Sequence, residues 1–140
     1  MNHLRLEIIC WSCLLLMMAA GTEAASVWKL PTAEMVYEDL ERCRQQGQDG
    51  QEEDAATLRC LVKKLGLWTD ESGYNGRRIA KIFAGQNQME ELMLVVEHCN
   101  RKERDTGHLD DWAFLAYRCA TSGQFGHWVK DFMSQKEAEQ

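Results

Sequence analysis

Apolar residues recur at helical spacing in one segment after another, and this pattern constrains the fold more than any other feature. The clearest run is Leu58, Leu61, Val62 and Leu65, which follows the i, i+3, i+4, i+7 spacing of one helical face. Glycines separate the periodic segments, where helices commonly end. No segment alternates apolar and polar residues for long enough to predict a strand. The spacing predicts an all-α chain of five to six short helices, at residues 32–46, 54–65, 75–84, 87–100, 109–121 and 124–135.

Composition and charge exclude several classes of function. The 140 residues carry a formal net charge of −6, and 45% of them are hydrophobic. This balance is typical of a globular domain and not of a disordered acidic chain. Lysine and arginine form no cluster beyond short pairs, so no basic surface for a phosphate backbone is expected. Nucleic acid is therefore not predicted as a partner.

The first 24 residues have the pattern of a secretory signal peptide. A positively charged start precedes an apolar run over residues 8–20, and small residues flank Glu23 at the positions that signal peptidase reads. An apolar run of about 13 residues is shorter than the ~20 needed to span a membrane, and no later stretch approaches a span. The sequence predicts cleavage near Ala24, with Ala25 as the next choice. The expected product is a secreted, extracellular single domain at residues 25–140.

Cleavage at this point would leave four of the six cysteines. They are Cys43, Cys60, Cys99 and Cys119, an even number that is typical of two disulfides in an oxidising compartment. Structural zinc sites usually contain close pairs such as C-x2-C, which these wide spacings do not provide, so no metal site is predicted. Four cysteines allow three connectivities, and their spacing alone does not choose among them.

Two pairs of residues invite an enzymatic interpretation. His98 beside Cys99 could form a base and thiol pair, but a disulfide-bonded cysteine leaves no nucleophile. Asp110 and Asp111 are adjacent carboxylates, but neighbours on a helix point about 100° apart, so first-turn capping explains them better. The sequence predicts no catalytic residue, no enzymatic activity and no cofactor.

The order and spacing of these features resemble a known protein family. Cys60 lies in the run LRCLVKKLGL at residues 58–67, Cys99 ends an apolar helical segment, and Cys119 closes the run DWAFLAYRC at residues 111–119. Together with the signal peptide and the helical pattern, these runs resemble the insect odorant-binding proteins of the pheromone and general-odorant type. The resemblance covers nearly all of residues 25–140.

That family typically has six cysteines, with a C-x3-C and a C-x8-C pair. Ala56 and Asp110 stand where two mutually bonded cysteines would be, so the chain resembles the four-cysteine, or minus-C, branch. The resemblance implies that the remaining bridges join Cys43 to Cys60 and Cys99 to Cys119. The segment between Cys43 and Ala56 is shorter than the family's second helix, so part of that pocket wall is expected to be missing.

The resemblance implies a compact helical bundle, linked by two disulfides, around a hydrophobic cavity. The implied function is a non-enzymatic carrier of small hydrophobic molecules such as odorants, pheromones or lipids. The alternative is a secreted helical interaction or structural domain with a filled core. A small hydrophobic ligand is the expected partner, and a receptor or other extracellular protein is a further candidate. The candidate ligand-binding residues are Leu65, Trp68, Phe83, Met89, Met93, Val96, Trp112, Leu115, Phe125, Trp128 and Phe132.

Overall fold

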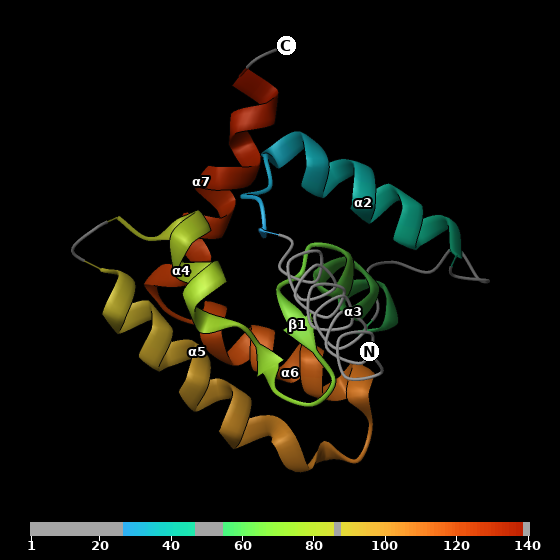
Figure 1. Cartoon of the computed structure of the whole chain (residues 1–140), viewed down its shortest axis with the longest axis vertical. Coiled ribbons are helices and arrows are strands. Elements are labelled where there is room, and N and C mark those ends of the chain that lie inside the picture. Colours follow the sequence, from blue (N-terminus) through green and yellow to red (C-terminus); the bar gives the residue numbers. More distant parts are fainter. Residues whose placement is uncertain (1–26, 47–54, 86–87, 139–140) are drawn as a thin grey trace, which may run out of the picture.

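The computed structural model describes residues 27–46, 55–85 and 88–138, and most of them are helical (Figure 1). The predicted all-α class is confirmed, because this part of the chain contains six helices. The predicted signal peptide at residues 1–24 lies outside the described residues. The helices are α2 (Ala33–Gln46), α3 (Ala55–Lys64), α4 (Gly76–Phe83), α5 (Met89–Glu103), α6 (Leu109–Thr121) and α7 (Gln124–Ala138), with a short 3-10 turn η1 (Arg104–Thr106) before α6.

The helices surround a common core. In Figure 1, α2 and α7 meet at one end of the molecule, and α5 runs along the opposite side. Helix α6 packs against both α3 and α5, and α4 packs against α5. The hydroxyl of Tyr37 on α2 donates a hydrogen bond of 3.5 Å to the carbonyl of Met133 on α7. Each helix therefore buries one apolar face against at least one neighbour, as short helices require for stability.

Local sequence signals set the ends of two helices. The Asn75 side chain caps α4 by accepting a hydrogen bond of 3.1 Å from the backbone N–H of Arg78. After α5 the chain tightens into η1 and reverses at Gly107, where φ is +84°. A left-handed backbone conformation of this kind favours glycine, which explains why α6 can start directly afterwards.

A short antiparallel hairpin lies between α3 and α4, although no strand was predicted there. Strands β1 (Trp68–Thr69) and β2 (Gly73–Tyr74) pair Trp68 with Tyr74 and Thr69 with Gly73. Strands of two residues are too short to produce an alternating pattern, so the sequence carried no signal for this hairpin. Gly73 has φ +81°, and an added Cβ would lie 2.8 Å from Asn100 Oδ1.

Two disulfides join neighbouring helices. Cys43 on α2 bonds to Cys60 on α3, and Cys99 on α5 bonds to Cys119 on α6. The pairing implied by the family resemblance is therefore confirmed. Both Cys43 and Cys99 are about 2% exposed, so one sulfur of each bridge is embedded in the core.

A polar side chain organises the core beneath the hairpin. Asn100 on α5 accepts a 3.0 Å hydrogen bond from the Tyr74 N–H and donates one of 2.8 Å to the Tyr74 carbonyl. The backbone carbonyl of Asn100 accepts the indole N–H of Trp112 at 3.0 Å. The Trp68 ring packs edge-on against Tyr74 and Trp112, at centroid distances of 4.8 and 4.7 Å. The hairpin is thus held by buried hydrogen bonds and aromatic packing.

Candidate functional site

A cavity of about 270 Å³ lies inside the helical bundle. Its walls come from all six helices and β2, from Leu65 and Leu67 in the turn after α3, and from Pro31 just before α2. Almost all of the lining side chains are aliphatic or aromatic. An apolar, concave space with few polar groups is the usual form of a small-molecule site.

Helices α3 and α7 each supply an apolar face to this cavity. On α3, Leu58, Leu61 and Val62 line it at helical spacing. On α7, Phe125, Val129, Phe132 and Met133 do the same. Spacings of three, four and seven residues direct these side chains to one side of each helix. The amphipathic pattern that folds the chain therefore also makes the cavity wall.

Three phenylalanines meet on the wall between α4 and α7. The ring of Phe83 contacts Phe125 and Phe132 edge-on, with centroids 5.3 and 5.2 Å apart. Phe125 is buried, whereas Phe83 and Phe132 are half-buried. Such edge-to-face contacts favour defined ring orientations, so the three rings form an ordered part of the cavity wall.

The chain segment before α2 is pinned over the turn that follows α3. The indole N–H of Trp28 donates to the Leu65 carbonyl at 2.9 Å, and the Arg78 guanidinium donates to the Gly66 carbonyl at 2.7 Å. The same guanidinium lies 5.1 Å from the centre of the Trp28 ring. These contacts hold the segment in place, so that Pro31 can close part of the cavity.

The cavity wall carries very little polarity. Of the described residues that line it, only Thr57, Tyr74 and Tyr117 have hydroxyl groups, and none is charged. The Tyr74 hydroxyl donates a 2.8 Å hydrogen bond to the Ala113 carbonyl. Burial raises the pKa of Tyr74 well above its usual range, with nearby Tyr117 contributing, so this phenol stays neutral.

The structure brings five of the candidate ligand-binding residues together on the cavity wall. These are Leu65, Phe83, Val96, Phe125 and Phe132. Their role in binding stays a prediction, because the structure contains no ligand. The other six candidates lie outside the lining: Trp68, Met89, Met93, Trp112, Leu115 and Trp128.

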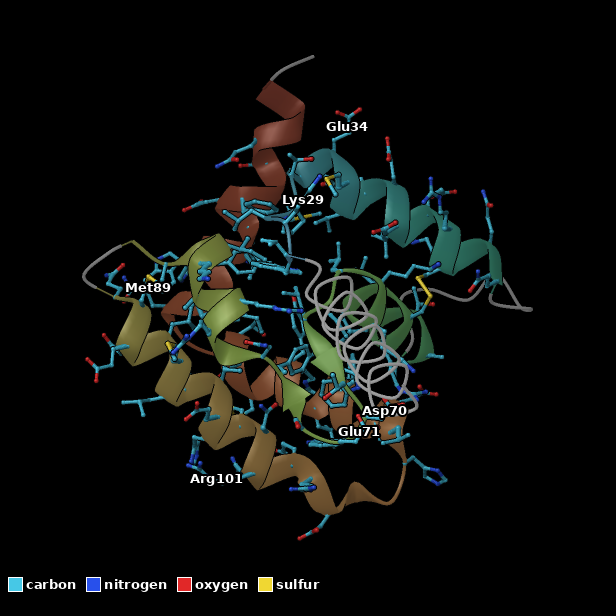
Figure 2. All side chains as sticks on the ribbon, in the orientation of Figure 1. Lys29, Glu34, Asp70, Glu71, Met89 and Arg101 are labelled. Carbon is cyan, nitrogen blue, oxygen red and sulfur yellow. A yellow bond between two sulfur atoms is a disulfide. The ribbon has the colours of Figure 1, made fainter. Side chains whose placement is uncertain are left out.

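The six residues outside the lining occupy two kinds of position. Trp68 and Trp112 are 3% and 4% exposed and fill the core beneath the hairpin. Met89, Met93, Leu115 and Trp128 are half-buried, and Figure 2 shows Met89 at the outer edge where α5 begins. On α6, the cavity is lined by Phe114 and Tyr117 rather than by Trp112 and Leu115. The cavity-facing side of α6 is therefore rotated from the predicted one.

Several lining residues were not among the candidates. Most are aliphatic residues of the predicted helical stripes, such as Leu40, Leu61 and Ile79, whose spacing had signalled burial but not contact with a cavity. Pro31 and Thr57 carried no sequence signal at all. Periodicity identifies the inward side of a helix, whereas the location of empty space depends on how the helices cross.

A charged cluster lies outside the cavity, next to the hairpin (Figure 2). Asp70 accepts hydrogen bonds from Arg59 Nη2 at 2.6 Å and from Arg59 Nε at 3.0 Å. The indole N–H of Trp68 and the Lys63 ammonium also donate to Asp70, at 2.9 and 3.2 Å. Arg59 reaches Asp110 in the first turn of α6 at 3.2 Å. The cluster therefore links α3, the hairpin and α6.

These donors, and above all Arg59, hold the pKa of the Asp70 carboxyl well below its usual range. Stability that depends on this carboxylate is therefore present above the ordinary aspartate pKa of about 3.9 and is lost as the pH falls below it. Asp70→Asn is expected to lower the free energy of unfolding by about 1 kcal/mol at pH 7, because water partly screens the pair. Below pH ~4 the difference from wild type should shrink.

Urea unfolding at a series of pH values measures this difference. Glu71→Gln is the matched control, because the neighbouring Glu71 side chain is exposed and should change stability little at any pH. A deficit for Asp70→Asn that stays constant from pH 7 to pH 3 would contradict the assigned role of the carboxylate.

Three further arrangements were looked for among the described residues: a thiol and base pair, a metal-binding group and a membrane-spanning helix. Cys99 is disulfide-bonded, so it cannot act as a thiolate beside His98. No group of three or more histidine, cysteine, aspartate or glutamate side chains in this part of the chain is placed to hold a metal ion. No helix in the same ranges is long and apolar enough to cross a membrane.

Taken together, these features define the class as a small helical protein with two disulfides and an apolar internal cavity. A family comparison agrees with this class: residues 30–122 match the model of the PBP/GOBP family. The chain belongs to this family of insect odorant-binding proteins. The match extends from the residue before Pro31 to the end of α6 and leaves out α7, which supplies the wall from Phe125 to Met133.

The other comparisons add no relatives. No curated protein matches the chain, and no solved structure matches it. The shortened segment between Cys43 and Ala56 falls mostly outside the described residues: α2 ends at Gln46 and α3 begins at Ala55. The two disulfides fit a four-cysteine pattern.

Proposed function

We propose that this protein is a secreted, non-enzymatic carrier that binds small hydrophobic molecules such as odorants or pheromones in its internal cavity. The observation that carries the proposal is the cavity of about 270 Å³, whose lining contains no charged side chain. Membership of a family of odorant-binding carriers supports the same function.

Burial of apolar ligand surface supplies the binding energy. A small ligand that buries roughly 300 Å² gains about 7 kcal/mol at ~25 cal/mol per Å². Loss of translational and rotational freedom reduces this gain. Dissociation constants weaker than about 10 μM are therefore expected. With so few polar contacts to satisfy, one cavity can accept several ligands of similar shape.

Two features support secretion. Residues 1–24 have the pattern of a signal peptide, and both disulfides of the described chain require an oxidising environment to persist. The proposed mature protein is the single domain at residues 25–140. Extracellular fluid is the compartment in which a carrier solubilises hydrophobic molecules.

The alternative function is a helical interaction domain with a filled core. Such a domain would contain no internal cavity. The cavity counts against it, because protein interiors are normally packed with few voids larger than a water molecule. The structure instead contains a cavity that is lined by all six helices and by β2.

Phe132→Trp is expected to weaken ligand binding without unfolding the protein. Phe132 is half-buried on the cavity wall, and a larger indole there would occupy ligand space instead of displacing packed atoms. Binding of 1-aminoanthracene, followed by its own fluorescence, should weaken at least fivefold in this variant. The free energy of unfolding should change by less than ~1 kcal/mol.

Trp128→Phe is the matched control, because Trp128 is also half-buried on α7 but does not line the cavity. Its affinity for the probe should equal that of the wild type. The carrier proposal fails if the wild type shows no saturable binding. It also fails if Phe132→Trp loses several kcal/mol of stability, which would place Phe132 in a filled core.

A further inference from the structure

A short non-helical segment before α2 forms part of the cavity wall. We call this segment, residues 28–31, the strap. In Figure 1 it runs from the start of α2, where α2 meets α7, toward the end of α3. Its last residue, Pro31, is buried and lines the cavity. The strap therefore separates part of the apolar interior from solvent.

Two side chains hold the first residue of the strap on the turn that follows α3. The Trp28 indole N–H donates a 2.9 Å hydrogen bond to the Leu65 carbonyl. The Arg78 guanidinium lies 5.1 Å from the centre of the Trp28 ring and donates a 2.7 Å hydrogen bond to the Gly66 carbonyl. We call Trp28 and Arg78 together the latch.

The two side chains of the latch meet at Gly66, where there is no room for a side chain. A Cβ atom on residue 66 would lie 3.1 Å from Arg78 Nη1 and 3.1 Å from both Cδ1 and Nε1 of Trp28. These distances are shorter than ordinary van der Waals contacts. The latch is therefore packed directly against the backbone of the turn.

The rest of the strap is weakly held. Lys29 and Leu30 are exposed, and so is Val27 just before the strap. Within the described part of the chain, residues 28–31 take part in no backbone–backbone hydrogen bond. Both disulfides join helices to helices. A segment with few buried contacts and no backbone hydrogen bonds opens more easily than the packed helices around it.

We infer that release of the latch lets the strap move aside, and that this opening controls how fast a ligand enters and leaves the cavity. The inference rests on the proposed carrier function. Neither Trp28 nor Arg78 lines the cavity, so both are positioning residues that act through Pro31.

A strap that closes over both the empty and the filled cavity has a distinct kinetic effect. Ligand exchange then passes through an open state, whose population multiplies the association and dissociation rate constants by the same factor. Weakening the latch should therefore raise both rate constants and leave the dissociation constant unchanged. Loss of a residue that contacts the ligand would instead raise mainly the dissociation rate and weaken affinity.

Stopped-flow fluorescence of 1-aminoanthracene measures both rate constants, and an equilibrium titration gives the dissociation constant. Trp28→Ala removes the indole hydrogen bond and the ring beside Arg78. Each of these interactions typically changes an equilibrium about threefold, so both rate constants should rise at least ~5-fold. The dissociation constant should stay within about twofold of the wild-type value.

Trp28→Phe keeps a ring beside Arg78 but lacks the N–H donor, so both rate constants should rise by only ~2- to 3-fold. This milder variant also tests the latch if Trp28→Ala does not fold. Arg78→Gln removes the cation beside the ring and should likewise raise both rate constants. Arg77→Gln is the matched control, because Arg77 is the exposed neighbour on α4 and should leave both rate constants unchanged.

The outcomes separate the two proposals. If 1-aminoanthracene shows no saturable binding to the wild type, the carrier function fails and the inference fails with it. If the probe binds but the Trp28 and Arg78 variants exchange it at wild-type rates, the carrier function stands and the inference is overturned. A faster dissociation matched by an equal loss of affinity also overturns the inference, as does an equal acceleration in Arg77→Gln.

Discussion

Asn100→Leu is expected to lower the free energy of unfolding by about 2 to 5 kcal/mol, the largest effect of any single substitution considered. Asn100 is 7% exposed and makes two hydrogen bonds to the Tyr74 backbone. Leucine has a similar size but no polar atom. The substitution would leave the Tyr74 N–H and carbonyl buried without these partners, and each unsatisfied group costs about 1 to 3 kcal/mol.

Urea unfolding followed by circular dichroism measures the change. Asn75→Ala is the control of the same residue type, because Asn75 is exposed and supplies a single capping bond to α4. That variant should lose about 1 kcal/mol. A loss for Asn100→Leu no larger than the loss for Asn75→Ala would show that the hairpin does not depend on Asn100.

Removal of either disulfide should cost about 3 kcal/mol, because each bridge closes a loop of roughly 20 residues in the unfolded chain. The bridges span 17 and 20 residues of sequence, so their effects should be similar. A small helical domain is marginally stable, and loss of both bridges is expected to leave it largely unfolded at 37 °C.

The paired variants Cys43→Ala/Cys60→Ala and Cys99→Ala/Cys119→Ala test this expectation in urea. Reduction of the wild type with a thiol should reproduce the combined effect. Loss of the Cys43–Cys60 bridge should also weaken probe binding, because it joins α2 and α3, which both line the cavity. A stability loss below ~0.5 kcal/mol in both variants would mean that helix packing alone maintains the fold.

The helices could be predicted from the sequence because their stabilising interactions repeat along the chain. The expected segment at residues 109–121 coincides with α6, and α7 begins at Gln124 as predicted but continues to Ala138. Apolar periodicity and glycine positions are local signals. Each can be recognised within a single helical segment, without knowledge of the rest of the fold. The disulfide pairing required the family resemblance, since four cysteines alone left three possibilities.

The hairpin and the cavity depend on contacts that are distant in sequence. Strand β2 is held by hydrogen bonds to Asn100, which lies 26 residues after Tyr74. No local sequence pattern predicts the contact between Asn100 and Tyr74. Likewise, Trp112 and Phe114 are both apolar residues of α6, yet the first fills the core and the second lines the cavity. The two side chains point in different directions from α6. Which direction faces the cavity depends on how the neighbouring helices pack against α6.

The central claim, that a ligand occupies the cavity, is tested most directly by nuclear Overhauser effects between unlabelled 1-decanol and the methyl groups of ¹³C-labelled protein. A ligand in the cavity should give cross-peaks to Val62, Ile79 and Val96, which are buried and line it. The exposed side chains Leu94, Val95 and Leu109 serve as the surface reference. Cross-peaks confined to these three surface residues, or none at saturating ligand, would contradict the account.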